Sequence, residues 1–198
     1  MKIEFDKSLL SFNTFGIAVS SRLFAEVISE NEIQEIIADA KLKNEKKFIL
    51  GGGSNILFTK NFDGLVLKNS LKGIQILKED VYNVWIKVAA GEVWHEFVMF
   101  CVEKNLAGIE NLSLIPGLTG AAPMQNIGAY GMEVKETCEE VEAINLDSGE
   151  KIIFGNADCK FGYRESIFKH ELKDQLIITS VTFKLNKIFK PKISYGDI

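Results

Sequence analysis

The segment from Ile115 to Gly131 is the feature that most constrains how this chain can fold. Glycine, alanine and proline make up most of it, so it has neither the period of a helix nor the alternation of a strand. Long segments of this kind are usually functional or disordered, and its two prolines favour an ordered backbone. We predict a loop that passes close to a flat ligand, with specific contacts from Gln125, Asn126 and Tyr130. The alternative is that this segment has only a structural role and wraps between two parts of the fold.

A second glycine-rich loop follows a short apolar run. It reads Gly51-Gly52-Gly53-Ser54-Asn55 and lies between predicted strands at 48–50 and 65–67. Without Cβ atoms such a backbone can bring amide N–H groups close to a pyrophosphate, and the serine and asparagine add side-chain donors. The loop lacks the Gly-Lys-Ser/Thr ending of a Walker A motif, and Ile56 breaks the Rossmann glycine pattern. A tight strand connection is the alternative.

An arginine follows an aromatic residue in the run Phe161-Gly162-Tyr163-Arg164-Glu165-Ser166. The pair puts an aromatic ring and a guanidinium side by side after a predicted helix end, which suggests a place in the same site. The alternative is an exposed ion pair between Arg164 and Glu165, worth about 0–1 kcal/mol.

Composition excludes several classes of protein. Of the 198 residues, 46% are hydrophobic and 25% are charged, which is typical of a globular chain and not of a disordered one. A net charge of −4 argues against a nucleic-acid partner, and no apolar stretch reaches the roughly 20 residues of a membrane helix.

The three cysteines lie far apart and are expected to be reduced packing residues. Two histidines are too few for a zinc site built on histidine and cysteine, so no metal is expected.

The periodicity predicts a compact βαββ lobe over residues 1–71. Ser29 and Glu32 form a capping box, and the apolar residues that follow predict a helix to about Asn44. The strands at 48–50 and 65–67 come next, with a turn at 61–64 before the second of them.

A second α+β lobe, packed against the first, is predicted over residues 72–198. Alternating apolar residues from Tyr82 to Val88 indicate a half-buried strand, and the apolar face that begins at Trp94 indicates a helix that ends near Ala107-Gly108. The other expected elements are strands at 141–146 and 151–154 joined by a turn at 147–149, a short helix capped by Asn156 and ending at Gly162, and a long strand at 176–185.

Taken together, these motifs resemble the UDP-N-acetylenolpyruvoylglucosamine reductase (UDP-N-acetylmuramate dehydrogenase) family of bacterial peptidoglycan synthesis. Besides the three runs above, the likeness is carried by Asn13-Thr14-Phe15-Gly16, Gly108-Ile109-Glu110-Asn111-Leu112, Ile167-Phe168-Lys169 and Tyr195-Gly196-Asp197. The motifs occur in the family's order from Asn13 to the last residue, nearly without gaps. The resemblance implies an α+β, two-lobed FAD-binding fold of the vanillyl-alcohol-oxidase/PCMH type.

The resemblance also implies a set of site residues. The loop of Gly51, Gly52, Gly53, Ser54 and Asn55 matches the residues that hold the pyrophosphate of a tightly bound FAD. The flavin and its ribityl chain would be lined by Pro116, Gly117, Gly120, Ala121, Gln125, Asn126, Gly128, Ala129 and Tyr130, with Ile178 near the isoalloxazine ring. Arg164 matches the family's catalytic arginine, Tyr163 its neighbour against the cofactor, and Tyr195 a tyrosine that contacts the substrate's diphosphate.

The family's reaction uses NADPH as co-substrate to reduce the enolpyruvyl ether of UDP-N-acetylglucosamine-enolpyruvate to UDP-N-acetylmuramate. Negative charge builds up on the substrate carboxylate, and a fixed guanidinium that grips it with two N–H groups lowers the barrier. The implied partners are therefore a UDP-sugar and NADPH. A cytoplasmic monomer that inserts into no membrane is expected.

In the family, a third, substrate-binding domain supplies a proton-donating serine and a late glutamate, both beyond the equivalent of Ile198. We therefore expect this chain to be the FAD-binding portion, without the substrate-binding domain, and inactive in isolation. Two alternatives stay open. One is a flavoprotein of the same fold with another substrate, and the other is a flavin-binding module without catalysis.

Overall fold

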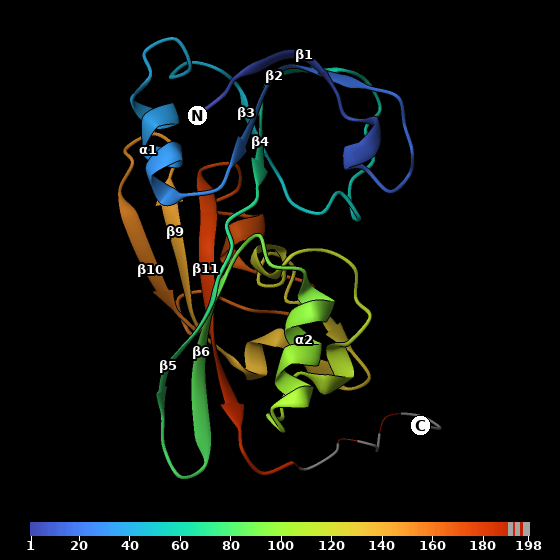
Figure 1. Cartoon of the computed structure of the whole chain (residues 1–198), viewed down its shortest axis with the longest axis vertical. Coiled ribbons are helices and arrows are strands. Elements are labelled where there is room, and N and C mark those ends of the chain that lie inside the picture. The colour runs from blue at the N-terminus through green and yellow to red at the C-terminus, as the bar shows by residue number, and fades with distance from the viewer. Residues whose placement is uncertain (190–191, 193–194, 196–198) are drawn as a thin grey trace.

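The computed structural model describes residues 1–189, 192 and 195, and it arranges them around two larger sheets (Figure 1). The first sheet has the order β1-β2-β4-β3 and contains β1 (Glu4–Ser8), β2 (Ser20–Val27), β3 (Lys47–Leu50) and β4 (Phe62–Asn69). β2 and β3 run parallel to β4, whereas β1 pairs antiparallel with β2. Leu65, Val66 and Leu67 of β4 are fully buried because apolar side chains cover both faces of the sheet at its centre.

Helix α1 (Glu30–Ala38) connects β2 to β3. Ser29 Oγ accepts a hydrogen bond from the Glu32 amide (3.3 Å), and the Glu32 carboxylate accepts one from the Ile28 amide (2.7 Å). The predicted cap is therefore confirmed, with its reciprocal bond one residue earlier than in a standard capping box.

The predicted end of this helix at about Asn44 is wrong. Asp39 is extended, and its carboxylate accepts a hydrogen bond from the Lys41 amide (2.8 Å). Such a local side-chain bond competes with the next helical turn, so the helix stops at Ala38 and a turn follows.

The second sheet is antiparallel throughout and has the order β10-β9-β11-β6-β5. Its strands are β5 (Ile74–Glu79), β6 (Asn83–Ala89), β9 (Cys138–Asn145), β10 (Lys151–Gly155) and β11 (Leu176–Asn186). Four of these strands confirm the predicted ones. β5 was not predicted, because this edge strand is exposed along nearly its whole length and carries no alternating pattern.

Helix α2 (Trp94–Glu103) packs on the second sheet (Figure 1). Its buried Trp94 and Phe97 contact Phe183 of β11, with ring centroids 5.7 and 5.1 Å from the Phe183 ring. The Trp94 indole also donates a hydrogen bond to the Leu112 carbonyl (2.7 Å). This aromatic cluster confirms the predicted apolar face and fixes the start of the helix. The helix ends at Glu103, so its predicted end near Ala107 and Gly108 is wrong.

Two other local predictions are wrong. Residues 61–64 do not form a turn, because β4 already begins at Phe62 and pairs there with β2. Asn156 does not cap a helix. It begins a turn, and its side-chain amide donates to two backbone carbonyls (2.8 and 2.6 Å) at and just before the start of β9.

The two sheets meet through a shared apolar core. Side chains from both parts make up this core, among them Leu23, Ile33, Ile36, Leu67, Ile144, Leu146 and Ile177. Asn69, at the end of β4, adds a hydrogen bond to the Ile178 carbonyl of β11 (2.8 Å). The first sheet uses residues 4–69 and the second residues 74–186. The division into lobes at 71 and 72 stays a prediction.

The three cysteines are buried free thiols, as expected for packing residues. Burial raises the pKa of Cys101 to about 12, so its thiolate is scarcely populated at neutral pH. Within the described residues, no helix is long and apolar enough to cross a membrane, and no group of three or more His, Cys, Asp and Glu side chains could hold a metal ion.

Candidate cofactor-binding site

A cavity of about 340 Å³ lies where β3 ends. One wall is the loop from Gly51 to Ile56, and another is formed by Ile115–Leu118 and the residues that follow. A second cavity of about 200 Å³ shares Gly51 and Leu118 with the first and extends to Ile178 on β11. The two cavities therefore adjoin and form one elongated site beside the junction of the two sheets.

Gly52 and Gly117 let the two walls of the first cavity approach each other. A Cβ on Gly52 would lie 3.2 Å from the Gly117 Cα, and Gly117 has a φ of +121°, which side chains rarely adopt. The Gly117 carbonyl accepts a hydrogen bond from the Trp94 amide (3.0 Å), so helix α2 holds this wall in place. Bare backbone on both walls fits a long anionic ligand such as the diphosphate of a dinucleotide.

Gly53 is glycine for a different reason. Its φ is +69°, and a Cβ there would lie 2.0 Å from the Phe12 carbonyl oxygen. The Gly53 carbonyl in turn accepts a hydrogen bond from the Thr14 amide (3.1 Å). Asn13 shapes this neighbouring segment through three hydrogen bonds to backbone groups (2.8, 3.0 and 2.9 Å). The Asn13–Gly16 motif thus packs against the Gly51–Asn55 loop and helps to hold its backbone in place.

The segment from 115 to 131 is ordered, as predicted. Its short 3-10 turn (Thr119–Ala121) docks beyond the end of β6, where the Gly120 amide donates to the Ala90 carbonyl (2.9 Å). The side-chain amide of Asn55 donates to Gln125 Oε1 (3.3 Å) and so joins the two glycine-rich loops.

Asn126 is fully buried, and its side chain bonds to other parts of the protein. Its Nδ2 donates to the Gly162 carbonyl (2.8 Å), and its Oδ1 accepts from the Lys135 amide (3.0 Å). Nearby, Ser166 Oγ donates to the Met124 carbonyl (2.6 Å). These bonds attach the turn that carries Arg164 to the 115–131 segment.

Arg164 itself is exposed, with a φ of +56°, in a turn closed by backbone hydrogen bonds between Gly162 and Glu165. The adjacent Tyr163 is 85% exposed. Glu165 binds Lys169 (3.0 Å) and His170 instead of the arginine. Hydrogen bonds from these two side chains hold the pKa of Glu165 below its usual value. The alternative of an Arg164–Glu165 surface pair is therefore not what the structure shows.

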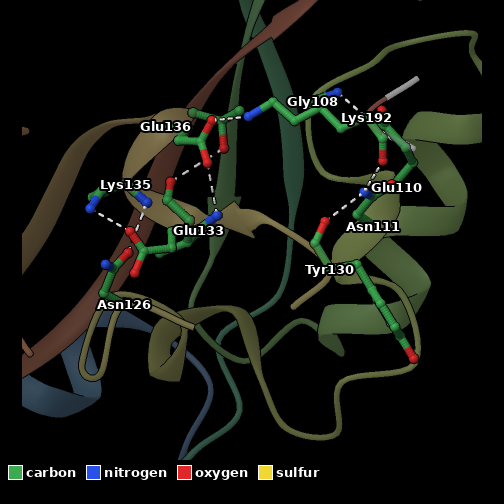
Figure 2. A network of polar contacts seen from close by, with 11 residues as sticks. Gly108, Glu110, Asn111, Asn126, Tyr130, Glu133, Lys135, Glu136 and Lys192 are labelled. Atoms are coloured by element: carbon green, nitrogen blue, oxygen red, sulfur yellow. Dashed lines mark hydrogen bonds and ion pairs between the residues drawn. The ribbon is translucent and has the colours of Figure 1, made fainter. Parts of the chain in front are cut away.

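Tyr130 lies in the turn of the hairpin formed by β7 (Gly128–Ala129) and β8 (Met132–Glu133). The Asn111 amide donates to the carbonyls of Tyr130 (3.0 Å) and Lys192 (2.9 Å), as Figure 2 shows. Lys192 also pairs with Glu136 (Figure 2). A Cβ on Gly131 would lie 3.3 Å from the Tyr195 Cβ, which places Tyr195 against the hairpin turn.

The predicted site residues divide into two groups. Those that line one or both cavities are Gly51, Gly52, Gly53, Ser54, Asn55, Pro116, Gly117, Gly120, Ala121, Gln125 and Ile178. Those outside both linings are Asn126, Gly128, Ala129, Tyr130, Tyr163, Arg164 and Tyr195.

Several lining residues were not predicted, among them Asn69, Met124 and Lys169. Met124 and Lys169 occur within recognised motifs, but a methionine or lysine there looks like any packing or surface residue. Asn69 is 109 residues away from its bonding partner Ile178, so no local pattern could have indicated it.

Comparisons with known proteins agree with this geometry. Residues 21–155 match the family described as "FAD binding domain". The chain is 53% identical over 199 residues to UDP-N-acetylenolpyruvoylglucosamine reductase from Flavobacterium johnsoniae, and 47% identical over 198 residues to the same enzyme from Amoebophilus asiaticus. Each match covers 100% of this chain and 58% of the relative, so the chain spans less than two thirds of their length.

Solved structures show the same fold. UDP-N-acetylenolpyruvylglucosamine reductase from Thermus caldophilus gives a TM-score of 0.71 at 23% identity, covering 96% of this chain and 63% of that one. A VAO-type flavoprotein from Myceliophthora thermophila gives a TM-score of 0.58 at 16% identity, covering 85% of this chain and 32% of that one.

The family match and the cavity between two glycine-rich walls define an FAD-binding domain, and its fold is shared with the VAO-type flavoprotein. The chain belongs to the FAD-binding domain family, and over its whole length it is homologous to UDP-N-acetylenolpyruvoylglucosamine reductases. The predicted fold class and cofactor are confirmed.

Proposed function

We propose that this chain is the FAD-binding portion of an NADPH-dependent reductase that converts UDP-N-acetylglucosamine-enolpyruvate to UDP-N-acetylmuramate in peptidoglycan synthesis. The proposal is carried by the elongated cavity between the Gly51–Ile56 and Ile115–Leu118 walls, in a chain whose relatives are reductases at 53% and 47% identity. A UDP-sugar and NADPH are then the partners of the whole protein. We expect that protein to be a cytoplasmic monomer.

The two walls would hold different parts of FAD. Backbone amides of the Gly51–Asn55 loop would face the pyrophosphate, because the loop lines the cavity and its three glycines carry no side chain. Pro116, Gly117 and the residues after them would line the flavin side, and Ile178 would contact its ring from the adjoining cavity. Bound FAD would supply hydride transfer, a chemistry that no amino-acid side chain offers.

Arg164 would grip the substrate carboxylate. Its turn is held at both ends, by Asn126 on the Gly162 carbonyl (2.8 Å) and by Lys169 on the Arg164 carbonyl (3.0 Å). A guanidinium carried on a turn held in this way can donate two parallel N–H groups and stabilise negative charge as it develops. Tyr163 would lie beside the cofactor, and Tyr195 would contact the substrate's diphosphate.

The identity of the cofactor gives a first test. The purified chain, reconstituted with a mixture of flavins, should retain FAD, because the two adjoining cavities form an elongated site beside a glycine-rich loop suited to a diphosphate. Heat release followed by mass spectrometry would identify the flavin. Retention of FMN in preference to FAD, or of no flavin at all, would contradict the assignment.

Activity gives a second test. The chain alone should bind FAD but should not reduce the enolpyruvyl sugar with NADPH, whereas a version with the full length of its relatives should do so. Turnover is followed by NADPH absorbance with both proteins at equal flavin content. A full-length protein that binds FAD without turnover would favour a non-catalytic flavin module. Turnover on a different acceptor would favour another flavoprotein of the same fold.

A further inference from the structure

One cationic side chain stands out in the first cavity. Among its described lining residues, Lys169 is the only lysine or arginine, and the others are apolar or neutral. The diphosphate of FAD carries two negative charges, and the chain as a whole has a net charge of −4. A cavity built for this group with neutral amides alone would leave much of that charge without a cationic partner.

The ammonium of Lys169 is held in place before any ligand binds. Lys169 ends the short 3-10 turn Ile167–Lys169, and its Nζ donates to the Arg164 carbonyl (3.0 Å) and to Glu165 Oε1 (3.0 Å). An ammonium has three N–H donors, so one remains for a further acceptor. The side chain is partly exposed, with 44% of its surface accessible, and its ion pair with Glu165 is therefore weak.

We propose that Lys169 binds the diphosphate of FAD and is a cofactor-binding residue of this domain. The inference rests on the proposed function, which supplies the dinucleotide. Lysine suits the role as a compact point charge that needs no fixed fork geometry. Lys169 also donates to the Arg164 carbonyl, so the same side chain would join the cofactor to the turn that carries the proposed catalytic residue.

A purely structural role for Lys169 makes a different prediction. If the side chain only held the Arg164 turn, its loss would weaken the binding of every flavin by a similar factor. If it binds the diphosphate, its loss should weaken FAD, which carries that group, and spare riboflavin, which has no phosphate.

The experiment measures dissociation constants by flavin fluorescence for FAD and riboflavin at two salt concentrations. Lys169→Gln keeps a donor for the Arg164 carbonyl but loses the charge, and Lys169→Arg keeps the charge. Lys160→Gln is the matched control, because Lys160 pairs with Glu171 (2.8 Å) and does not line the cavity.

Lys169→Gln should weaken FAD binding about ten- to hundredfold and reduce its salt dependence. It should change riboflavin binding less than about threefold, and Lys169→Arg and Lys160→Gln should stay close to the unmodified chain.

Unchanged FAD affinity in Lys169→Gln, or equal weakening of FAD and riboflavin, would overturn the proposal. Should riboflavin bind too weakly to measure, the salt dependence of FAD binding decides, because loss of a charged contact must flatten it. An unmodified chain that binds no FAD would instead overturn the proposed function, and with it this inference.

Discussion

Replacing Arg164 with alanine is expected to slow substrate reduction by roughly 10²–10³-fold in a protein with the full length of the relatives, because one preorganised electrostatic partner is lost where charge develops. Reduction of the cofactor by NADPH should change much less, since no carboxylate charge forms in that step. Flavin binding should also persist, because Arg164 lines neither cavity. Stopped-flow absorbance of the flavin follows the two half-reactions separately.

Two further variants sharpen this experiment. Arg164→Lys should restore only part of the rate, because one ammonium cannot reproduce a bidentate grip. Arg22→Ala is a matched control, since Arg22 is exposed and pairs with Glu45 and Asp63 on the first sheet. Equal slowing of both half-reactions in Arg164→Ala would make the arginine a structural part of the cofactor site. Near-normal rates in both would remove it from the mechanism.

Replacing Gly53 with alanine is expected to destabilise the chain and to weaken FAD binding by more than about tenfold. The first side-chain atom would meet the Phe12 carbonyl oxygen at 2.0 Å and would force the two loops apart. Overpacking of this kind typically costs about 1–3 kcal/mol, and the left-handed backbone adds about 1–2 kcal/mol. Urea unfolding of the flavin-free chain measures the stability, and flavin fluorescence measures the affinity.

Gly16 provides the matched control for this prediction. Its φ of +63° is close to the +69° of Gly53, but a Cβ there would meet nothing within 4 Å. Gly16→Ala should therefore show the backbone cost alone. If the two variants lose equal stability, the contact with Phe12 does not matter. If Gly53→Ala binds FAD normally, the loop is only a strand connection.

Strong local patterns predicted most of the larger elements. The alternation in β6 and the apolar face of α2 appear in the sequence because each buries one side against the same core. Elements without such a pattern could not be found in this way. β5 is an exposed edge strand, and Asp39 ends α1 through a side-chain bond that a helical period does not reveal.

The roles of individual site residues depended more on tertiary contacts. The polar side chain of Asn126 suggested a ligand contact. Its side-chain amide is instead hydrogen-bonded to two backbone groups that lie 36 and 9 residues away in sequence. Gly53 looked like part of a phosphate loop, and its closest neighbour turned out to be Phe12. Sequence spacing gives no information on such partners, because they are brought together only when the loops pack.

The sequence by itself determined the family, the cofactor and the two glycine-rich walls. Bare backbone cannot fill a core, so such segments must serve close approach or turns, and their ordered motifs carry the resemblance to the reductases. Only the tertiary structure decided that Gly52 lies against Gly117 beside the first cavity and that Lys169 is the lysine in the lining of that cavity. The reason is physical: a short motif fixes which groups a chain can offer, whereas the packing of loops far apart in sequence fixes which of those groups meet.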